Sequence, residues 1–255
     1  MAAAGCLKTM TRIIESPISE ESIVAIEGDI MSILEFVFLE EGIDYIEDAL
    51  VTLNAYLFKV PKLSGPLWFF YQVIIYNLVG IPKDMWANLE SLPIPEKQKK
   101  IMINIRNSDN YEMMERSMPV LRNFIQKCSI LPTTEPQFEH FKANIIQLLF
   151  YLISEMYKKP PNEFNGELDI TCCVALFIYL LENFQGRLQE TVYTHIYEFC
   201  KINLNKYKSK MMKTLNAQLI GLLLWIVPTQ TLTSAHKDGQ LENFLKEMTA
   251  HQAKL

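Results

Sequence analysis

The chain contains 255 residues, of which 49% are hydrophobic and 21% are charged, and this balance excludes an intrinsically disordered protein. It has only nine glycines, fewer than architectures of strands and turns usually need. The net charge of −5 disfavours a nucleic-acid-binding protein, because such proteins normally present a basic surface, and it suits basic protein partners. We therefore expect a folded helical protein that does not bind DNA.

The N-terminal part of the chain is expected to form amphipathic helices. Apolar residues spaced three and four apart predict helices over residues 2–14, 22–39 and 46–57. The first ends before Pro17, and Gly42 separates the other two. Because the link at Gly42 is only a few residues long, the second and third helices should be antiparallel neighbours in an αα-hairpin.

The remaining helices are separated by links that contain proline or glycine. A helix rich in aromatic residues is predicted over residues 66–79, and we interpret its rings as part of the core. Three prolines limit the next stretch to short helices over 84–89 and 97–106. Further helices are predicted over residues 111–128, 137–158, 168–183, 187–203, 209–226 and 239–249.

Apart from the short helices over 84–89 and 97–106, the elements total about ten helices, and no segment has the pattern of a strand. Helix pairs recur about every 40 residues or slightly more, near residues 22–57, 111–157 and 168–203, and this is the period of HEAT and armadillo repeats. The predicted fold class is therefore all-α, an α-solenoid of HEAT-like helical hairpins, with residues 1–255 in a single domain. A compact helical bundle is the alternative.

Neither the cysteines nor the histidines follow the pattern of a reactive or metal-binding site. The five cysteines are odd in number and include no CxxC pair, so we interpret them as reduced thiols, as in the cytosol or nucleus. The four histidines have no ligand-like spacing to each other or to the cysteines. There is also no GxSxG, phosphate-binding loop or HExxH motif. We predict that the protein is not an enzyme and binds no cofactor; a helical enzyme whose residues converge only in space is the alternative.

Two apolar runs, residues 67–81 and 219–227, are too short to cross a membrane, which takes about 20 apolar residues. The first run also contains Gln72 and Asn77. We expect both runs to be helices buried between neighbours, and we predict no membrane insertion.

An acidic cluster around Gly42 is the sharpest charged feature of the sequence. Its members are Glu40, Glu41, Asp44, Glu47 and Asp48. As a functional site, the cluster would be an electronegative strip for protein segments rich in Lys and Arg, provided that one continuous helix carries it. As a structural feature, its acids lie in the first turns of a helix, where the helix dipole favours negative charge. Both interpretations stay open.

A basic cluster flanks the start of the predicted helix over residues 209–226. Its members are Lys206, Lys208, Lys210 and Lys213. It would contact an acidic partner or RNA phosphates, or it is a solvated loop between helices. Tyr207 is the only aromatic residue among these lysines, so a platform for nucleic-acid bases has little support.

Four segments of the sequence resemble the C-terminal half of importin-β-type nuclear transport receptors, and most of all the large importins of the seven/eight type. The segments are AAAGCLKTMTRIIESP, ILEFVFLEEGIDYIEDALVTLNAYLFKVP, GPLWFFYQVI and SDNYEMMERSMPVLRNFIQKCS. The last is similar to a family helix that follows a proline-containing loop, and the matching positions are Asp109, Tyr111, Pro119, Leu121, Asn123 and Phe124. The resemblance covers residues 2–245.

The resemblance implies a superhelical stack of HEAT repeats that carries protein cargo through nuclear pores, between cytoplasm and nucleus. Family members contact the FG motifs of pore proteins in shallow apolar grooves between outer helices. They bind Ran-GTP mainly through N-terminal repeats that this sequence lacks, so Ran dependence does not carry over. The chain is then expected to be the C-terminal part of a longer receptor or a short derivative of one. The alternative is a HEAT-repeat scaffold or regulatory subunit that assembles protein complexes in the cytoplasm.

Overall fold

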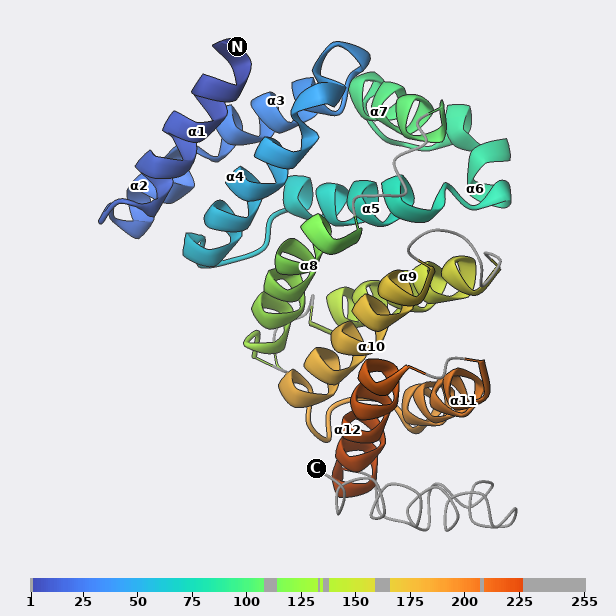
Figure 1. Cartoon of the computed structure of the whole chain (residues 1–255). Helices are drawn as coiled ribbons and strands as arrows, with labels where there is room; N and C mark the ends of the chain where they lie inside the picture. Colours follow the sequence, from blue (N-terminus) through green and yellow to red (C-terminus); the bar gives the residue numbers. More distant parts are fainter. Residues whose placement is uncertain are drawn as a thin grey trace. The chain divides into compact units, whose positions relative to one another are not determined.

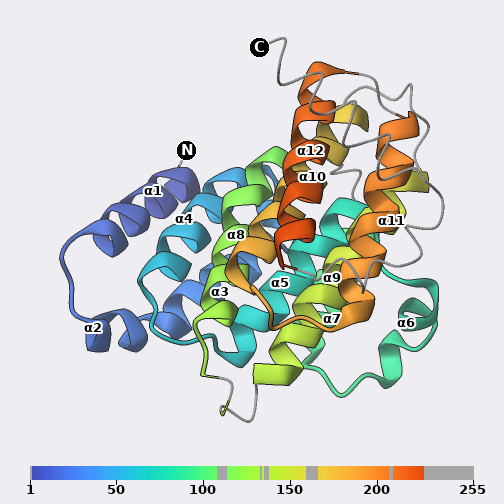
Figure 2. The ribbon, with the colours of Figure 1, turned by 90° about the horizontal axis from the view of Figure 1, so that it is seen from below.

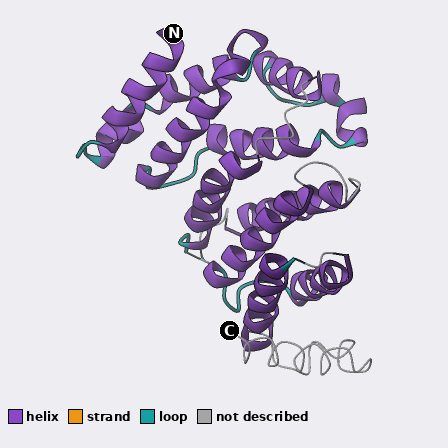
Figure 3. Ribbon diagram, viewed as in Figure 1, coloured by secondary structure: helices purple, strands orange, loops and turns teal. Residues whose placement is uncertain are grey.

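The computed structural model describes residues 2–107, 114–132, 134, 138–158, 166–206 and 209–226. Throughout these ranges the regular structure is helical, without a strand (Figure 3). The chain divides into two compact units, Met1–Cys172 and Cys173–Leu255, which are described separately below. Helix α10 (Gly166–Asn183) runs across the boundary between them. No helix within the described ranges is both long enough and apolar enough to cross a membrane.

The first unit contains nine α-helices and two short 3-10 helices within its described residues, besides the start of α10 (Figure 1). The elements are α1 (Ala2–Glu15), α2 (Glu20–Ala25), α3 (Glu27–Val37), η1 (Glu40–Tyr45), α4 (Ile46–Lys59), α5 (Gly65–Val79), α6 (Lys83–Ala87), η2 (Leu89–Ser91), α7 (Glu96–Asn107), α8 (Met114–Ser129) and α9 (Phe138–Lys158).

Helices α1, α4 and α8 lie side by side in a parallel row, here called the first row (Figures 1 and 2). Thr11 of α1 contacts Thr52 of α4, 41 residues later. Between α4 and α8 the step is 69 residues at both Asn54–Asn123 and Phe58–Lys127. A constant step along two helices means that they run in the same direction and in register. The first row is therefore built like the outer or inner layer of a helical-repeat stack.

Helices α5 and α9 form a second parallel row, and both pack against α8 of the first row. Trp68 of α5 stacks on Phe141 of α9 with ring centroids 4.4 Å apart. The Tyr71 hydroxyl donates a hydrogen bond to the Ile145 carbonyl, and further along Tyr151 donates one to Gly80. The contacts again advance along both helices together. As interpreted from the sequence, Phe69, Phe70, Tyr71 and Tyr76 of α5 belong to the core, whereas Trp68 is half-buried. Burial raises the pKa of Tyr71 well above its usual value.

Two rows of parallel helices joined by alternating links constitute an α-solenoid of HEAT-like hairpins, so the predicted fold class is confirmed. The step from α1 to α4 is close to the expected period, whereas the step from α4 to α8 is longer. The extra length corresponds to the segment that contains α6, η2 and α7, and α7 packs against α5 and α3. This insertion hid the regular period of the stack in the sequence.

The structure differs from the predicted hairpin in two respects. The expected helix over residues 22–39 is two helices, because the backbone leaves helical geometry at Ile26. Glu27, directly after this break, accepts a 2.7 Å hydrogen bond from the Tyr56 hydroxyl, so α3 does contact α4. The main packing partners of α4, however, are α1 and α8. Apolar periodicity identifies the buried face of a helix but not the helix that covers it.

The second unit holds the remainder of α10 together with α11 (Glu190–Lys206) and α12 (Lys210–Ile226). Helices α11 and α12 pack against each other. Phe177 of α10 meets Phe199 of α11 edge to face, with ring centroids 5.1 Å apart. The predicted helix over residues 239–249 lies outside the described residues.

Gly42 in η1 fills a position with no room for a side chain. A Cβ atom there would lie 2.5 Å from the Cα of Val37 and 2.6 Å from the carbonyl oxygen of Phe36, both backbone atoms that cannot rotate away. We expect Gly42→Ala to destabilise the fold by about 1–3 kcal/mol, because the chain must shift to relieve the overlap. Thermal or urea unfolding followed by circular dichroism measures the effect.

Gly5→Ala is the matched control, because Gly5 lies inside α1 with nothing within 4 Å of the added Cβ. It should stabilise the protein by about 0.5–1 kcal/mol through helix propensity. Equal effects of the two substitutions would contradict the close approach at Gly42.

Candidate functional site

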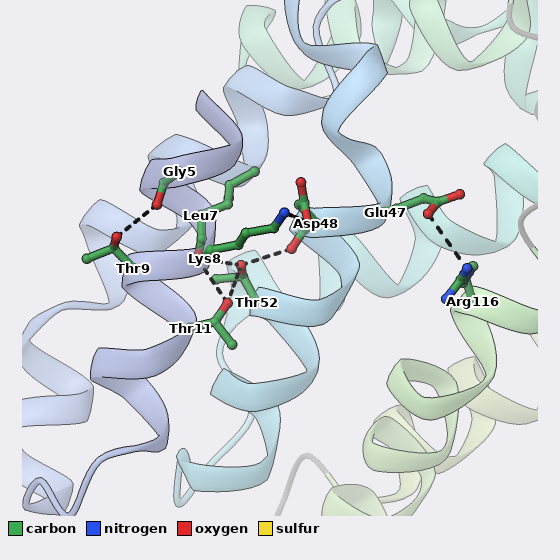
Figure 4. Close-up of polar contacts among 9 residues, drawn as sticks. All are labelled: Gly5, Leu7, Lys8, Thr9, Thr11, Glu47, Asp48, Thr52 and Arg116. Atoms are coloured by element: carbon green, nitrogen blue, oxygen red, sulfur yellow. Dashed lines mark hydrogen bonds and ion pairs between the residues drawn. The ribbon is translucent and has the colours of Figure 1, made fainter. Parts of the chain in front are cut away.

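The contact between α1 and α4 combines a buried hydroxyl pair with an exposed ion pair (Figure 4). The hydroxyls of Thr11 and Thr52 lie 2.9 Å apart and both are buried. The Leu7 carbonyl oxygen lies 2.9 Å from the Thr11 hydroxyl and the Asp48 carbonyl oxygen 3.0 Å from the Thr52 hydroxyl, so one hydroxyl donates to its carbonyl while the other donates across the pair. One helical turn closer to the N-termini of α1 and α4, the Lys8 ammonium lies 4.0 Å from the Asp48 carboxylate. The buried hydroxyl pair therefore sets the register of α1 against α4, and the exposed ion pair adds little to it.

The contact between α4 and α8 is polar along its outer edge. Asn123 donates a 2.8 Å hydrogen bond to the side-chain oxygen of Asn54. The Lys127 ammonium donates to the Phe58 carbonyl at 3.2 Å, and burial lowers the pKa of this lysine. The Arg116 guanidinium lies 3.9 Å from the Glu47 carboxylate. Side chains of α8 thus reach α4 at its beginning, middle and end.

The acidic cluster predicted from the sequence is divided between these two contacts. Figure 4 shows Glu47 pointing towards Arg116 of α8 and Asp48 pointing towards Lys8 of α1. Glu40, Glu41 and Asp44 belong to the 3-10 helix η1, so no continuous α-helix carries the cluster and side chains four residues apart do not share a face. Asp44 is exposed, and the side chains of Glu40 and Glu41 lie outside the described residues.

Glu47 and Asp48 lie in the first turn of α4, as the structural interpretation of the cluster requires. Both also face a cation of a neighbouring helix. A basic partner would have to compete with Lys8 and Arg116 for these carboxylates. The role of the cluster in protein binding stays a prediction.

The basic cluster belongs to the second unit, at the turn between α11 and α12. Lys206 is the last residue of α11, where the helix dipole favours a cation. Lys210 is the exposed first residue of α12, where the dipole disfavours one, and Lys208 lies outside the described residues. Ser209 caps α12 by accepting a 3.1 Å hydrogen bond from the Met212 amide. The binding role of these lysines also stays a prediction.

Two exposed apolar side chains on α4 were not singled out in the sequence. Val51 is 57% exposed and Phe58 is 67% exposed, and they lie seven residues apart on one face of the helix. Asn54 lies between them and bonds to Asn123 of α8, so this face borders the outer edge of α8. We call Val51, Asn54 and Phe58, with Asn123 and Lys127, the α4–α8 face. The sequence does indicate that these two residues are exposed, because Val51 and Phe58 fall outside the buried apolar stripe of the helix.

The thiols show no arrangement for nucleophilic chemistry. Cys128, Cys172, Cys173 and Cys200 are buried, and Cys6 is exposed on α1. Burial, followed by the nearby Asp169 carboxylate, raises the pKa of Cys172 to about 11, and burial also raises the pKa of Cys200. Among the described residues no group of His, Cys, Asp and Glu side chains could hold a metal ion. What the surface offers is a pair of exposed apolar side chains, Val51 and Phe58, beside the polar contacts of α4 with α8.

The fold and this surface define the chain as an all-α helical-repeat protein with exposed apolar positions on a helix row. Comparison with known proteins finds no matching family model, no matching curated protein and no matching solved structure.

The Thr11–Thr52 pair provides a test of how the first row is held together. Replacing either threonine by valine should cost about 1 kcal/mol, because a buried hydroxyl loses one of its hydrogen-bond partners. The double replacement should cost less than the two single costs combined, with a coupling energy of about 0.5–1 kcal/mol. Unfolding in urea measures all three variants.

Thr9→Val is the control for this cycle, because the Thr9 hydroxyl bonds only to Gly5 of its own helix and is exposed. It should change stability by less than about 0.5 kcal/mol. Strict additivity of the Thr11 and Thr52 replacements would show that the pair does not couple α1 to α4.

The cysteines are predicted to differ sharply in reactivity. With the folded chain at mildly alkaline pH, an alkylating reagent should label Cys6 first, because the other four thiols are buried and burial raises the pKa of Cys172 and of Cys200. Mass spectrometry after brief labelling locates the modified residue. Cys6→Ser should remove the fast phase, and rapid labelling of Cys172 or Cys200 in the folded chain would overturn the assignment.

Proposed function

We propose that this chain is a protein-binding α-solenoid of the importin type, which carries protein cargo into the nucleus and contacts the FG repeats of nuclear-pore proteins. The proposal is supported by the resemblance of the sequence to the C-terminal half of importin-β-type receptors and by the two parallel helix rows. Its sites of action are the cytoplasm, the nucleus and the nuclear pore. Ran binding is not part of the proposal.

The observation that carries the proposal is the exposure of Val51 and Phe58 on the α4–α8 face. An exposed phenylalanine beside a valine on a helix row is a suitable contact for the phenylalanine ring of an FG motif. The contact is shallow, so each motif would bind weakly and exchange quickly. Many weak contacts to a repetitive partner give useful total affinity without slow release, which transport through a pore requires.

Cargo binding is assigned to charge rather than to apolar contact. The net charge of −5 and the acids Asp44, Glu47 and Asp48 on the first unit favour a cargo rich in lysine and arginine. Glu47 and Asp48 are weakly held by Arg116 and Lys8 at 3.9 and 4.0 Å. Exposed ion pairs of this length contribute about 0–1 kcal/mol, so a clustered basic segment can displace them.

A HEAT-type scaffold that assembles other proteins is the second candidate function. An exposed apolar side chain also occurs on the second unit, at Ile202 of α11, which is 52% exposed. Apolar surface on both units favours a chain that contacts more than one protein. Binding of folded partners without any affinity for FG-repeat peptides would favour this candidate.

Val51 and Phe58 provide the direct test of FG binding. Val51→Ser and Phe58→Ser should each weaken binding of the full chain to an FG-repeat peptide by roughly 5–30-fold, the equivalent of about 1–2 kcal/mol of lost apolar contact. Fluorescence anisotropy with a labelled peptide measures the dissociation constants. A peptide in which serine replaces phenylalanine should not bind.

Val24→Ser and Phe36→Ser are matched controls, because they make the same chemical changes at exposed positions on α2 and α3. They should leave peptide affinity unchanged. A folded chain that fails to bind FG-repeat peptides, or that loses equal affinity in all four variants, would overturn the proposed contact.

A further inference from the structure

One face of α12 has the apolar spacing of a helix-packing face, yet its end residues are exposed. Residues at intervals of four and three along this face form what we call the α12 seam: Met211, Leu215, Gln218, Leu222 and Trp225. Four of the five are apolar. Met211 is 58% exposed, Trp225 is 71% exposed, and the two leucines are half-buried. Spacing of this kind is typical of a helix that packs against a second helix.

A neighbouring face of α12 is already buried. It carries Met212, Leu219, Ile220 and Leu223, and α12 packs against α11. Met211 and Trp225 of the seam stay largely exposed beside this buried face. An exposed apolar stripe at the spacing of helix packing, next to a face that is already buried, indicates that a further helix covers it.

A segment with the complementary pattern follows α12 in the sequence. Within residues 239–249, Leu241, Phe244, Leu245 and Met248 recur at the spacing of one helix face, and polar residues occupy the other positions. The segment carries Glu242 and Glu247 against one lysine, whereas α12 begins with Lys210 and Lys213 and has no acidic residue. The two segments are therefore matched in apolar spacing and opposite in net charge.

The link between α12 and this segment is long enough for the two to meet. Residues 227–238 can span about 40 Å when extended, whereas the 17 residues of α12 measure about 25 Å along the axis. The segment can therefore reach any part of the seam. Because it is tethered, it meets the seam at an effective concentration that no free partner of similar affinity reaches.

We propose that residues 239–249 dock as an amphipathic helix on the α12 seam and complete the second unit. A helix of this length is marginal alone in water, so it forms on docking. Leu241, Phe244, Leu245 and Met248 cover Leu222 and Trp225 and the neighbouring seam positions. This inference does not depend on the proposed transport function.

Fluorine NMR of the full chain labelled with fluorotryptophan tests the proposal. The three tryptophans give separate signals, and loss of one signal in Trp225→Phe identifies that of Trp225. Replacing Leu241 and Phe244 by serine should shift the Trp225 signal towards that of a solvent-exposed ring. The signals of Trp68 and Trp86, both in the first unit, should not move.

Replacing both Asn243 and Lys246 by serine is the matched control, because these positions lie on the polar side of the same apolar pattern. It should leave the Trp225 signal in place. The proposal is overturned if Trp225 is unaffected by the loss of Leu241 and Phe244, or if both double variants shift its signal equally. A shift that disappears on dilution also overturns it, because a second copy of the chain would then cover the seam.

Discussion

The first row depends on α4, the helix that is packed on both sides. Its inner residues Leu50, Leu53 and Leu57 are almost completely buried, and the row neighbours α1 and α8 lie on either side of it. Polar contacts then define the register at both contacts, with Thr52 towards α1 and Asn54 towards α8. Hydrophobic burial supplies most of the stabilisation, whereas the hydrogen bonds select one register among the many that leucine packing alone would accept.

The position of α4 between two row neighbours explains why the acidic cluster is divided between two helix contacts. A carboxylate at the start of a row helix is favoured by the dipole of its own helix and lies within reach of lysines and arginines on both neighbours. Glu47 and Asp48 lie in the first turn of α4, and Glu47 pairs with Arg116 of α8 whereas Asp48 pairs with Lys8 of α1. Charged residues that cluster in the sequence are thereby distributed over two helix contacts. The surface of the row is more evenly charged than the sequence indicates, and its distinctive feature is the apolar pair Val51 and Phe58.

Much of the fold was accessible from the sequence because each helix carries its own signals. The helix predicted over residues 46–57 is observed as Ile46–Lys59, and that over 66–79 as Gly65–Val79, where Ser64 caps the start and Gly80 follows the end. The break at Ile26 has no such signal, since neither proline nor glycine occupies that position. Helix pairing was also inaccessible, because the insertion with α6 and α7 lengthens one repeat and lets helices distant in sequence become neighbours.

The candidate site follows the same logic. Patterns in a single helix reveal what is buried, so the exposed residues Val51 and Phe58 appear only as exceptions to the stripe, and their relation to Asn123 of α8 requires the structure. The α12 seam shows the complementary case. An inner helix such as α4 has a row neighbour on each side, whereas α12 is the last described helix and keeps Met211 and Trp225 exposed beside its contact with α11. Each repeat of a hairpin stack packs against its neighbours, so a stripe of four apolar residues at the spacing of helix packing is a place where a further helix can pack.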